Sequence, residues 1–319
     1  MIGQRNYAIS QNNSSTPAGS AIQFDVTCNN APASVTQNGE ADALEVATFT
    51  VSARIPLGKC PVYAVQTPDA RRLFVLNRGS DTVTVINTQN NTLNACTPFV
   101  NQGGRLVTCH PTLPLSTMAG LTGTNVPTAA GPVYAEYNTA TQQLIIADYD
   151  GGAISVIDVS TDIYGDDSAT FGTTFTIPVG KNPASVTVLA DGSRAYTANQ
   201  GDGIQNGTVT IVNLSSHTVE KTLGVVGHPR TVASTSNSLY GKVYVASPDS
   251  PFLTIIRTDQ DIVDTTVLVE GNVVDVRVNT QDANKGNAVN TSRIPGGGQP
   301  CYLPGATNSA TLAACQTLP

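Results

Sequence analysis

Histidine is the residue best suited to acid–base chemistry near neutral pH, and the chain contains only three: His110, His217 and His228. No Gly-x-Ser-x-Gly motif accompanies them, so a serine nucleophile of that type is not indicated. His228 and Arg230 belong to the segment GHPR before an expected strand, and Glu136 belongs to the expected strand PVYAEY. Catalysis would require these three side chains to converge. The favoured interpretation is that His228 holds the backbone of a turn.

Pairs of aspartates are the second candidate for chemistry. Asp148 and Asp150 occur in ADYDGG, and Asp166 and Asp167 occur in YGDDS. Such oxygen ligands suit calcium, but the spacing differs from that of an EF-hand, and solvated turn residues are the favoured interpretation. Three histidines are too few for a copper or haem site of several histidines. Neither a Walker loop nor a dinucleotide fingerprint is present, so the sequence predicts no bound cofactor.

The six cysteines indicate disulfides and an oxidising compartment. None forms a Cys-x-x-Cys pair, which disfavours a zinc framework, and the alternative to disulfides is buried free thiols. Six cysteines allow 15 connectivities. The pairs expected here are Cys96–Cys109, Cys301–Cys315 and Cys28–Cys60.

Composition excludes several classes of protein. The formal net charge is −7 and no run of Lys or Arg occurs, so nucleic acid is not an expected partner. No apolar run is long enough to span a membrane. Charged residues make up only 12% of the 319 residues, and Gly, Asn, Thr, Ser and Val are abundant. This composition is typical of short strands joined by many turns.

One repeated unit organises the chain. It begins at Pro61, Pro132, Pro183 and Pro229, and each copy contains three or four short segments of strand character separated by turn residues. Examples are PVYAVQ (61–66), RLFVLN (72–77) and TVTVIN (82–87). Four antiparallel strands in about 45 residues are typical of a β-propeller blade. The sequence therefore predicts an all-β propeller of four-stranded antiparallel blades.

The two ends of the repeat region suggest how a ring could close. GQRNYAIS (3–10), AIQFDV (21–26) and VATFTVSARIPLG (46–58) match second, third and fourth strands, so the first blade lacks its inner strand. Residues 271–279 follow the last blade and are expected to supply that strand, because closure removes exposed sheet edges. The predicted domain covers 1–279, and its five blades are 1–58 with 271–279, 59–130, 131–180, 181–226 and 227–270. The alternative is part of a seven-bladed ring.

Two segments interrupt the repeat, and one residue type recurs within it. Residues 93–131 form a long insertion with Cys96 and Cys109, and insertions of this length are often functional. Residues 280–319 form a Gly/Asn/Pro-rich tail with two cysteines, expected either as a flexible end or as an arm that adds a strand to a neighbouring molecule.

The cations that open second strands are expected to pair with turn carboxylates, or alternatively to bind an anion as a ring: Arg5, Arg72, Arg194 and Lys242.

The segments RLFVLN, KVYVAS, TVTVIN, AISVID and TVTIVN, with the linker IPVGKNP, resemble the YVTN-type β-propeller repeat proteins of bacterial and archaeal surfaces. The lactonase-like propellers are more distant relatives. The resemblance covers about residues 3–279 and implies a propeller. Proteins of this type usually have seven blades, whereas this chain shows five.

These observations predict an exported, non-catalytic propeller that acts as a cell-surface, extracellular or periplasmic binding or structural module. The expected partners are a protein or glycan at the cell surface, or further copies of the chain in a homo-oligomer or filament, contacted through the insertion and the tail. The alternative is a lactonase-like enzyme that uses the central channel. Innermost strands line such a channel, which is why His228, Arg230 and Glu136 are its candidate residues.

Overall fold

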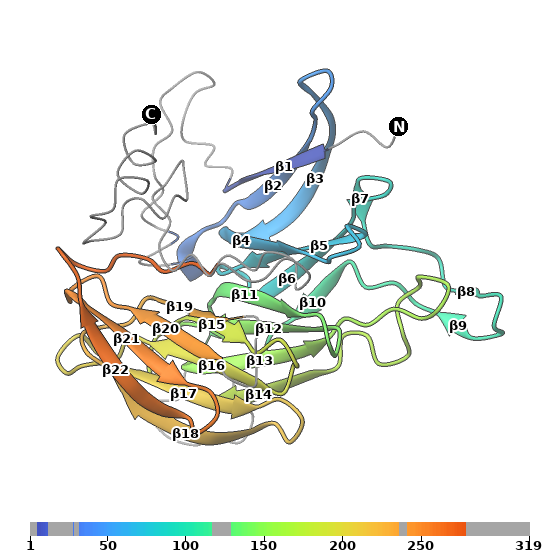
Figure 1. Cartoon of the computed structure of the whole chain (residues 1–319). Helices are drawn as coiled ribbons and strands as arrows, with labels where there is room; N and C mark the ends of the chain where they lie inside the picture. Colours follow the sequence, from blue (N-terminus) through green and yellow to red (C-terminus); the bar gives the residue numbers. More distant parts are fainter. Residues whose placement is uncertain (1–4, 12–27, 29–31, 117–128, 236–240, 279–319) are drawn as a thin grey trace, which may run out of the picture. The chain divides into compact units, whose positions relative to one another are not determined.

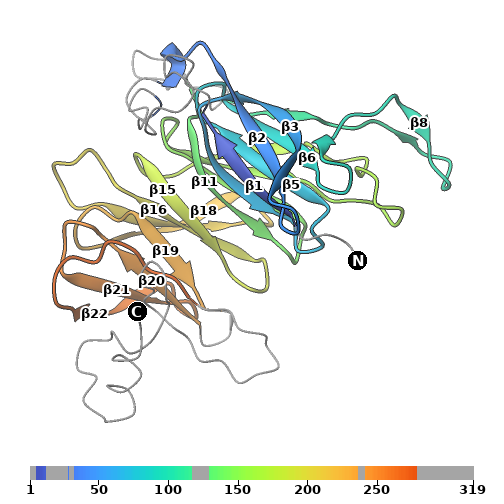
Figure 2. The same ribbon diagram turned by 90° about the horizontal axis from the view of Figure 1, so that it is seen from above.

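The computed structural model describes residues 5–11, 28, 32–116, 129–235 and 241–278. Apart from Cys28, which is helical, their regular elements are β-strands and one short 3-10 helix, η1 (Pro32–Ser34) (Figures 1 and 2). The chain divides into two compact units, residues 1–176 and 177–319. Within the described ranges, no helix is both long and apolar enough to cross a membrane.

The first unit contains three large sheets and one small one. The first sheet has the order β1-β2-β3 and the second β10-β6-β5-β4, with β7 also paired to β6. The third has the order β11-β12-β13-β14, and β8 and β9 form a separate two-stranded sheet. The strands are β1 (Arg5–Ser10), β2 (Asn38–Glu45), β3 (Thr50–Lys59), β4 (Pro61–Gln66), β5 (Arg72–Asn77), β6 (Thr82–Asn87), β7 (Thr92–Leu93), β8 (Phe99–Val100), β9 (Leu106–Val107), β10 (Thr112–Pro114), β11 (Pro132–Asn138), β12 (Gln143–Asp148), β13 (Ala153–Asp158) and β14 (Thr174–Pro178).

The second unit contains two four-stranded sheets, with the orders β15-β16-β17-β18 and β19-β20-β21-β22. In both, each strand pairs antiparallel with the next one along the chain. The strands are β15 (Pro183–Val188), β16 (Arg194–Asn199), β17 (Thr208–Asn213), β18 (Thr218–Gly224), β19 (Thr231–Ser234), β20 (Lys242–Ala246), β21 (Phe252–Arg257) and β22 (Ile262–Leu268).

Burial across each sheet follows the sequence pattern. All six residues of β5 are buried, as are most residues of β12 and β16, which fits the apolar sequence of these second strands. The outermost strands β18 and β22 are largely exposed and rich in polar residues. Four-stranded antiparallel meanders of this kind are propeller blades, which confirms the predicted all-β propeller class.

The cores form between successive sheets within each unit. In the first unit, Phe74 and Leu76 of β5 and Leu144 and Ile146 of β12 belong to one fully buried cluster. In the second unit, Tyr196 belongs to a comparable cluster between its two sheets. Packing of this kind fixes the turns at the ends of neighbouring strands, and those turns carry the polar groups described below.

The first sheet differs from its prediction in one strand. The expected second and fourth strands appear as β1 and β3, but β2 (Asn38–Glu45) lies between them and was not predicted. Gly39, Ala41 and Ala43 are the buried residues of β2 and alternate with more exposed ones. Ala, Gly, Asp and Glu all have low strand propensity, so the sequence of β2 does not indicate a strand. The expected strand AIQFDV (21–26) lies outside the described residues.

The segment expected to complete the first blade does not form a strand. Residues 271–278 have no regular secondary structure, and Gly271 turns the chain with a φ of 77°. The Val276 N–H donates to the side chains of Thr231 and Asp275. Such local side-chain bonds compete with a strand ladder. Residues 271–278 therefore lack the strand conformation expected of them, and closure of the ring, which would join the two units, stays a prediction. The blade number and the single domain over 1–279 stay predictions.

The described part of the insertion, residues 93–116 and 129–131, contains several short strands. Its strand β10 pairs with β6, as does β7 immediately before it, and together they occupy the fourth-strand position of the second sheet. Between β7 and β10 the chain leaves the sheet and forms the β8–β9 hairpin, which extends away from β6 and β10 in Figures 1 and 2. We call residues 96–109 the arm.

Candidate functional site

A buried carboxylate, Asp167, lies at the base of the arm. Its side chain is fully buried and accepts hydrogen bonds from Asn94 Nδ2 at 2.9 Å and from the His110 backbone N–H at 3.1 Å. His110 Nδ1 lies 3.0 Å from the same carboxylate, and the Arg72 guanidinium lies 3.5 Å away. The His110 ring stacks on Phe171, with 5.2 Å between ring centroids. Asp167 thus connects β5, the arm and the chain after β13.

The arm is held by covalent and polar contacts. Cys96 and Cys109 form the predicted disulfide at its base. Near its tip, Arg105 Nη2 and Asn101 Nδ2 each donate to Asp162 at 2.8 Å. The hydrogen bond from Arg105 is the largest cause of the lowered pKa of Asp162. Arg105 also donates to the backbone carbonyl of Asp167. These contacts fix the arm against residues 161–167, which we call the arm loop.

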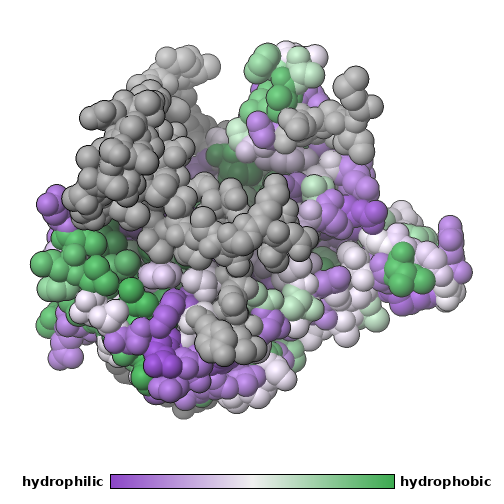
Figure 3. Space-filling view, viewed as in Figure 1, coloured by the Kyte–Doolittle hydropathy of each residue, from purple (hydrophilic) through white to green (hydrophobic). Residues whose placement is uncertain are grey.

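The arm and the arm loop expose large apolar side chains. Val100 and Leu106 are 66% and 61% exposed, and Ile163 is 91% exposed. Phe99 and Tyr164 are exposed as well. Figure 3 shows apolar atoms gathered at this end of the molecule, over β8 and β9. We call these five side chains the apolar tip.

The acidic residues considered for calcium already have protein partners. Asp148 is fully buried and accepts a 2.6 Å hydrogen bond from Ser155, and burial raises its pKa well above the ordinary range. Both oxygens of Asp150 accept from the Arg78 guanidinium, at 2.8 and 3.0 Å. Asp166 is half-buried and its backbone bonds to Asp162. Over the described ranges, no group of three or more His, Cys, Asp or Glu side chains is arranged to hold a metal ion.

The candidate catalytic residues lie in two units. His228 and Arg230 precede and adjoin β19 in the second unit, whereas Glu136 lies on β11 in the first, so their convergence stays a prediction. Asp249 accepts from the His228 backbone N–H at 2.9 Å, and its carboxylate lies 2.5 Å from His228 Nδ1. Partial desolvation acts to raise the pKa of Asp249, but the hydrogen bonds from His228 lower it overall. Arg230 is exposed, and its backbone N–H bonds to Ala246.

Of the three predicted disulfides, the structure contains Cys28–Cys60 and Cys96–Cys109. Cys301 and Cys315 lie outside the described residues, as does the whole tail 280–319. His217 is a turn residue with a left-handed backbone, φ 56°.

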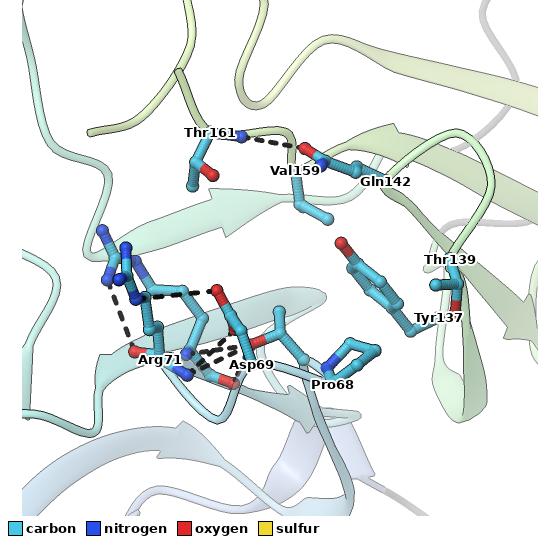
Figure 4. Close-up of a pocket in the computed structure, with 10 residues that line it drawn as sticks. Pro68, Asp69, Arg71, Tyr137, Thr139, Gln142, Val159 and Thr161 are labelled. Carbon is cyan, nitrogen blue, oxygen red and sulfur yellow. Dashed lines mark hydrogen bonds and ion pairs between the residues drawn. The ribbon is translucent and has the colours of Figure 1, made fainter. Parts of the chain in front are cut away.

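A pocket of about 170 Å³ opens in the first unit between the β4–β5 turn and the β11–β12 turn (Figure 4). Its walls combine two arginines, the carboxylate of Asp69, hydroxyls and apolar surface. The Tyr137 hydroxyl and the Asp69 carboxylate point into the space between the turns. The lining residues are Thr67, Pro68, Asp69, Arg71, Arg72, Tyr137, Thr139, Gln142, Val159 and Thr161.

Sequence reasoning missed both the Asp167 cluster and this pocket. His110 and Asp167 are separated by 57 positions, and neither stands in a motif that links them. Only the recurrence of a cation at the start of second strands singled out Arg72 in advance. The sequence does not show that Arg72 lies beside Asp167, because nothing in it places the arm loop next to β5.

Comparison of the sequence with protein-family models and with curated proteins gives no match. Three solved structures are similar to the chain: hydrazine synthase of Kuenenia stuttgartiensis (14% identity, TM-score 0.49, 69% of this chain and 52% of that one), a putative 6-phosphogluconolactonase of Bacteroides fragilis (13%, 0.47, 74% and 66%) and the dihydro-heme d1 dehydrogenase NirN in complex with DHE (12%, 0.46, 77% and 54%). The chain spans between about half and two thirds of the length of these proteins. Likeness at this level carries no argument about activity.

Proposed function

We propose that this chain is an exported, non-catalytic propeller module, of the YVTN type that its repeats resemble, and that the arm is its contact element. The observation that carries the proposal is the apolar tip, which is exposed yet held in a fixed position. The proposed partner is a protein at the cell surface, including a second copy of the chain.

Exposed apolar side chains alone are common on protein surfaces, so the contacts that hold the arm in place are what support the proposal. Here a disulfide closes the base of the arm, and Asp162 accepts hydrogen bonds from both Asn101 and Arg105 nearer the tip. A surface ordered before binding loses less conformational entropy when a partner covers it. Aromatic side chains such as Phe99 and Tyr164 are enriched at the centre of protein interfaces.

Location outside the cytoplasm is supported by the two disulfides, since such bonds persist mainly in oxidising compartments. Cys28–Cys60 joins segments 32 positions apart, and Cys96–Cys109 closes the arm. Both cysteine pairs therefore act on structure, and neither leaves a thiol for chemistry.

The proposal is tested by the mass of the natively isolated protein, measured by light scattering. We expect wild type to form an assembly well above the 33.0 kDa of one chain, and Leu106→Asp to dissociate it. Val219→Asp is the matched control, because Val219 is an exposed valine on the outermost strand β18. A monomeric wild type, or an assembly that Leu106→Asp leaves intact, would contradict the proposal.

A lactonase-like enzyme is the second candidate, and the His228–Asp249 pair is the observation in its favour. A carboxylate on Nδ1 orients an imidazole for proton transfer at Nε2. Here Nε2 is buried and has no hydrogen-bond partner among the described residues. Lactone hydrolysis by the wild-type protein that His228→Gln abolishes, while Val219→Asp retains it, would establish the enzyme and displace the binding module.

A further inference from the structure

The cations that open the second strands are not equivalent. In the second unit, Arg194 pairs with Asp261 and donates to the Thr258 carbonyl at 2.8 Å, and Lys242 pairs with Asp264 at 2.6 Å. Arg72 occupies the same strand position in the first unit. The polar contacts of its guanidinium are all long: 3.4 Å to the carbonyls of Arg71 and Gly165 and 3.5 Å to Asp167. Arg72 therefore differs from Arg194 and Lys242.

Arg72 is also buried, with a side chain only 8% exposed, and its Nε has no hydrogen-bond partner within the described part of the chain. A buried guanidinium is costly unless its N–H groups are hydrogen-bonded. Asp167 does not satisfy it closely, because the oxygens of that carboxylate accept from Asn94 and His110 at shorter distances. The side chain of Arg72 lines the pocket between the β4–β5 and β11–β12 turns, and neither of its hydrogen bonds to a carbonyl is shorter than 3.4 Å.

A second guanidinium lines the same pocket. Arg71 is half-exposed and lies 3.8 Å from Asp69, well beyond the 2.7–2.9 Å of a charge-assisted hydrogen bond. Asp69 instead accepts from the Thr67 hydroxyl and the Arg71 backbone N–H. By contrast, Arg78 binds both oxygens of Asp150 closely. Both pocket arginines thus retain donors for a further acceptor.

We propose that this pocket binds a small monocarboxylate, with its carboxylate on Arg72 and Arg71 and its apolar body between Pro68, Val159 and the Tyr137 ring. Arginine is the residue best matched to a carboxylate, because its planar fork donates two parallel hydrogen bonds. The apolar wall requires an aromatic or short aliphatic body. A cavity of about 150 Å³ accepts benzene, so a pocket of about 170 Å³ suits a ligand of the size of benzoate. This site is separate from the apolar tip and does not depend on the function proposed for it.

Benzoate is the probe, titrated into the full chain and followed by calorimetry and ligand-detected NMR. We expect saturable binding of one benzoate per chain with a Kd of about 1 mM or tighter. The neutral isostere benzamide should fail to bind, because it lacks the charge that both arginines recognise. Benzoate that does not saturate, or benzamide that binds equally well, would overturn the proposal.

Two variants locate the site. Arg72→Lys keeps a cation beside Asp167 but removes the Nε donor and the planar fork, and should weaken benzoate binding by about tenfold or more. Arg194→Lys makes the same change at the matched strand position and should leave binding unchanged. Arg71→Glu reverses a charge on a half-exposed side chain, folds without disturbing the core and should abolish binding. Equal affinity in wild type, Arg72→Lys and Arg71→Glu would overturn the proposal.

Discussion

Replacing Asp167 by asparagine removes one buried charge and nearly preserves the shape of the side chain. Asn94 Nδ2 and the backbone N–H and ring Nδ1 of His110 would then face an amide that has only one acceptor oxygen in place of two. Arg72 would lose its nearest carboxylate, and both members of that pair are almost completely buried. Removing one partner of a buried pair typically costs about 3–5 kcal/mol, because the remaining charge is left uncompensated.

For a unit of this size, that loss lowers the melting temperature by roughly 6–20 °C. The assay is thermal unfolding of wild type and Asp167→Asn under oxidising conditions, followed by near-ultraviolet circular dichroism. Asp259→Asn is the matched control, since Asp259 pairs with Arg257 at the surface and such pairs contribute about 1 kcal/mol or less. If Asp167→Asn lost no more stability than this control, the Asp167 cluster would not be what holds the arm to the sheets.

Three further results follow from the structure. Cys109→Ser removes the disulfide with Cys96 and should lower the free energy of unfolding by about 3 kcal/mol or less. Amide exchange should become faster within the arm, while the sheets keep their protection. Equal exchange of the arm in wild type and variant would contradict the role of the disulfide in holding it. Asp148→Asn should raise the melting temperature at pH 7 but not near pH 4. Burial raises the pKa of Asp148 in the folded protein, so wild type loses stability as the pH rises above the unfolded pKa of about 3.9, by about 1.4 kcal/mol per pH unit. Equal melting temperatures of the two proteins from pH 4 to 8 would refute the burial argument. Gly180→Ala places a Cβ 2.7 Å from the Asn199 side chain and should destabilise the second unit by about 1–3 kcal/mol. The measurement is denaturant titration, and an unchanged unfolding midpoint would show that the packing there is loose.

The fold was predictable where periodic patterns and turn residues agree. The segments at 61–66, 72–77 and 82–87 form β4, β5 and β6 with the predicted bounds, because apolar and β-branched residues there are flanked by turn residues. The pattern failed at β2, whose inward positions are Gly and Ala, and at 271–278, where Asp275 bonds to the local backbone. At β2 the alternation is present but its inward residues have low strand propensity, whereas at 271–278 local side-chain bonds replace the strand ladder.

The candidate site was less predictable than the fold. Two cysteine pairs were correctly assigned from their positions in neighbouring blades and across a loop. Asp167 was recognised only as one of two adjacent acids, since nothing in YGDDS reveals which of them turns inward. Its partners Arg72, Asn94 and His110 come from β5 and the insertion, and only the packing of sheet against sheet brings them together.

The central claim is that the arm is a pre-ordered contact surface, and hydrogen–deuterium exchange tests it most directly. The measurement compares the natively isolated protein with the purified single chain at the same pH. We predict that residues 99–107 and 162–166 gain protection in the native material, whereas the exposed strand β18 exchanges equally in both. Equal exchange of the arm in the two samples would show that nothing covers the apolar tip and would contradict the account.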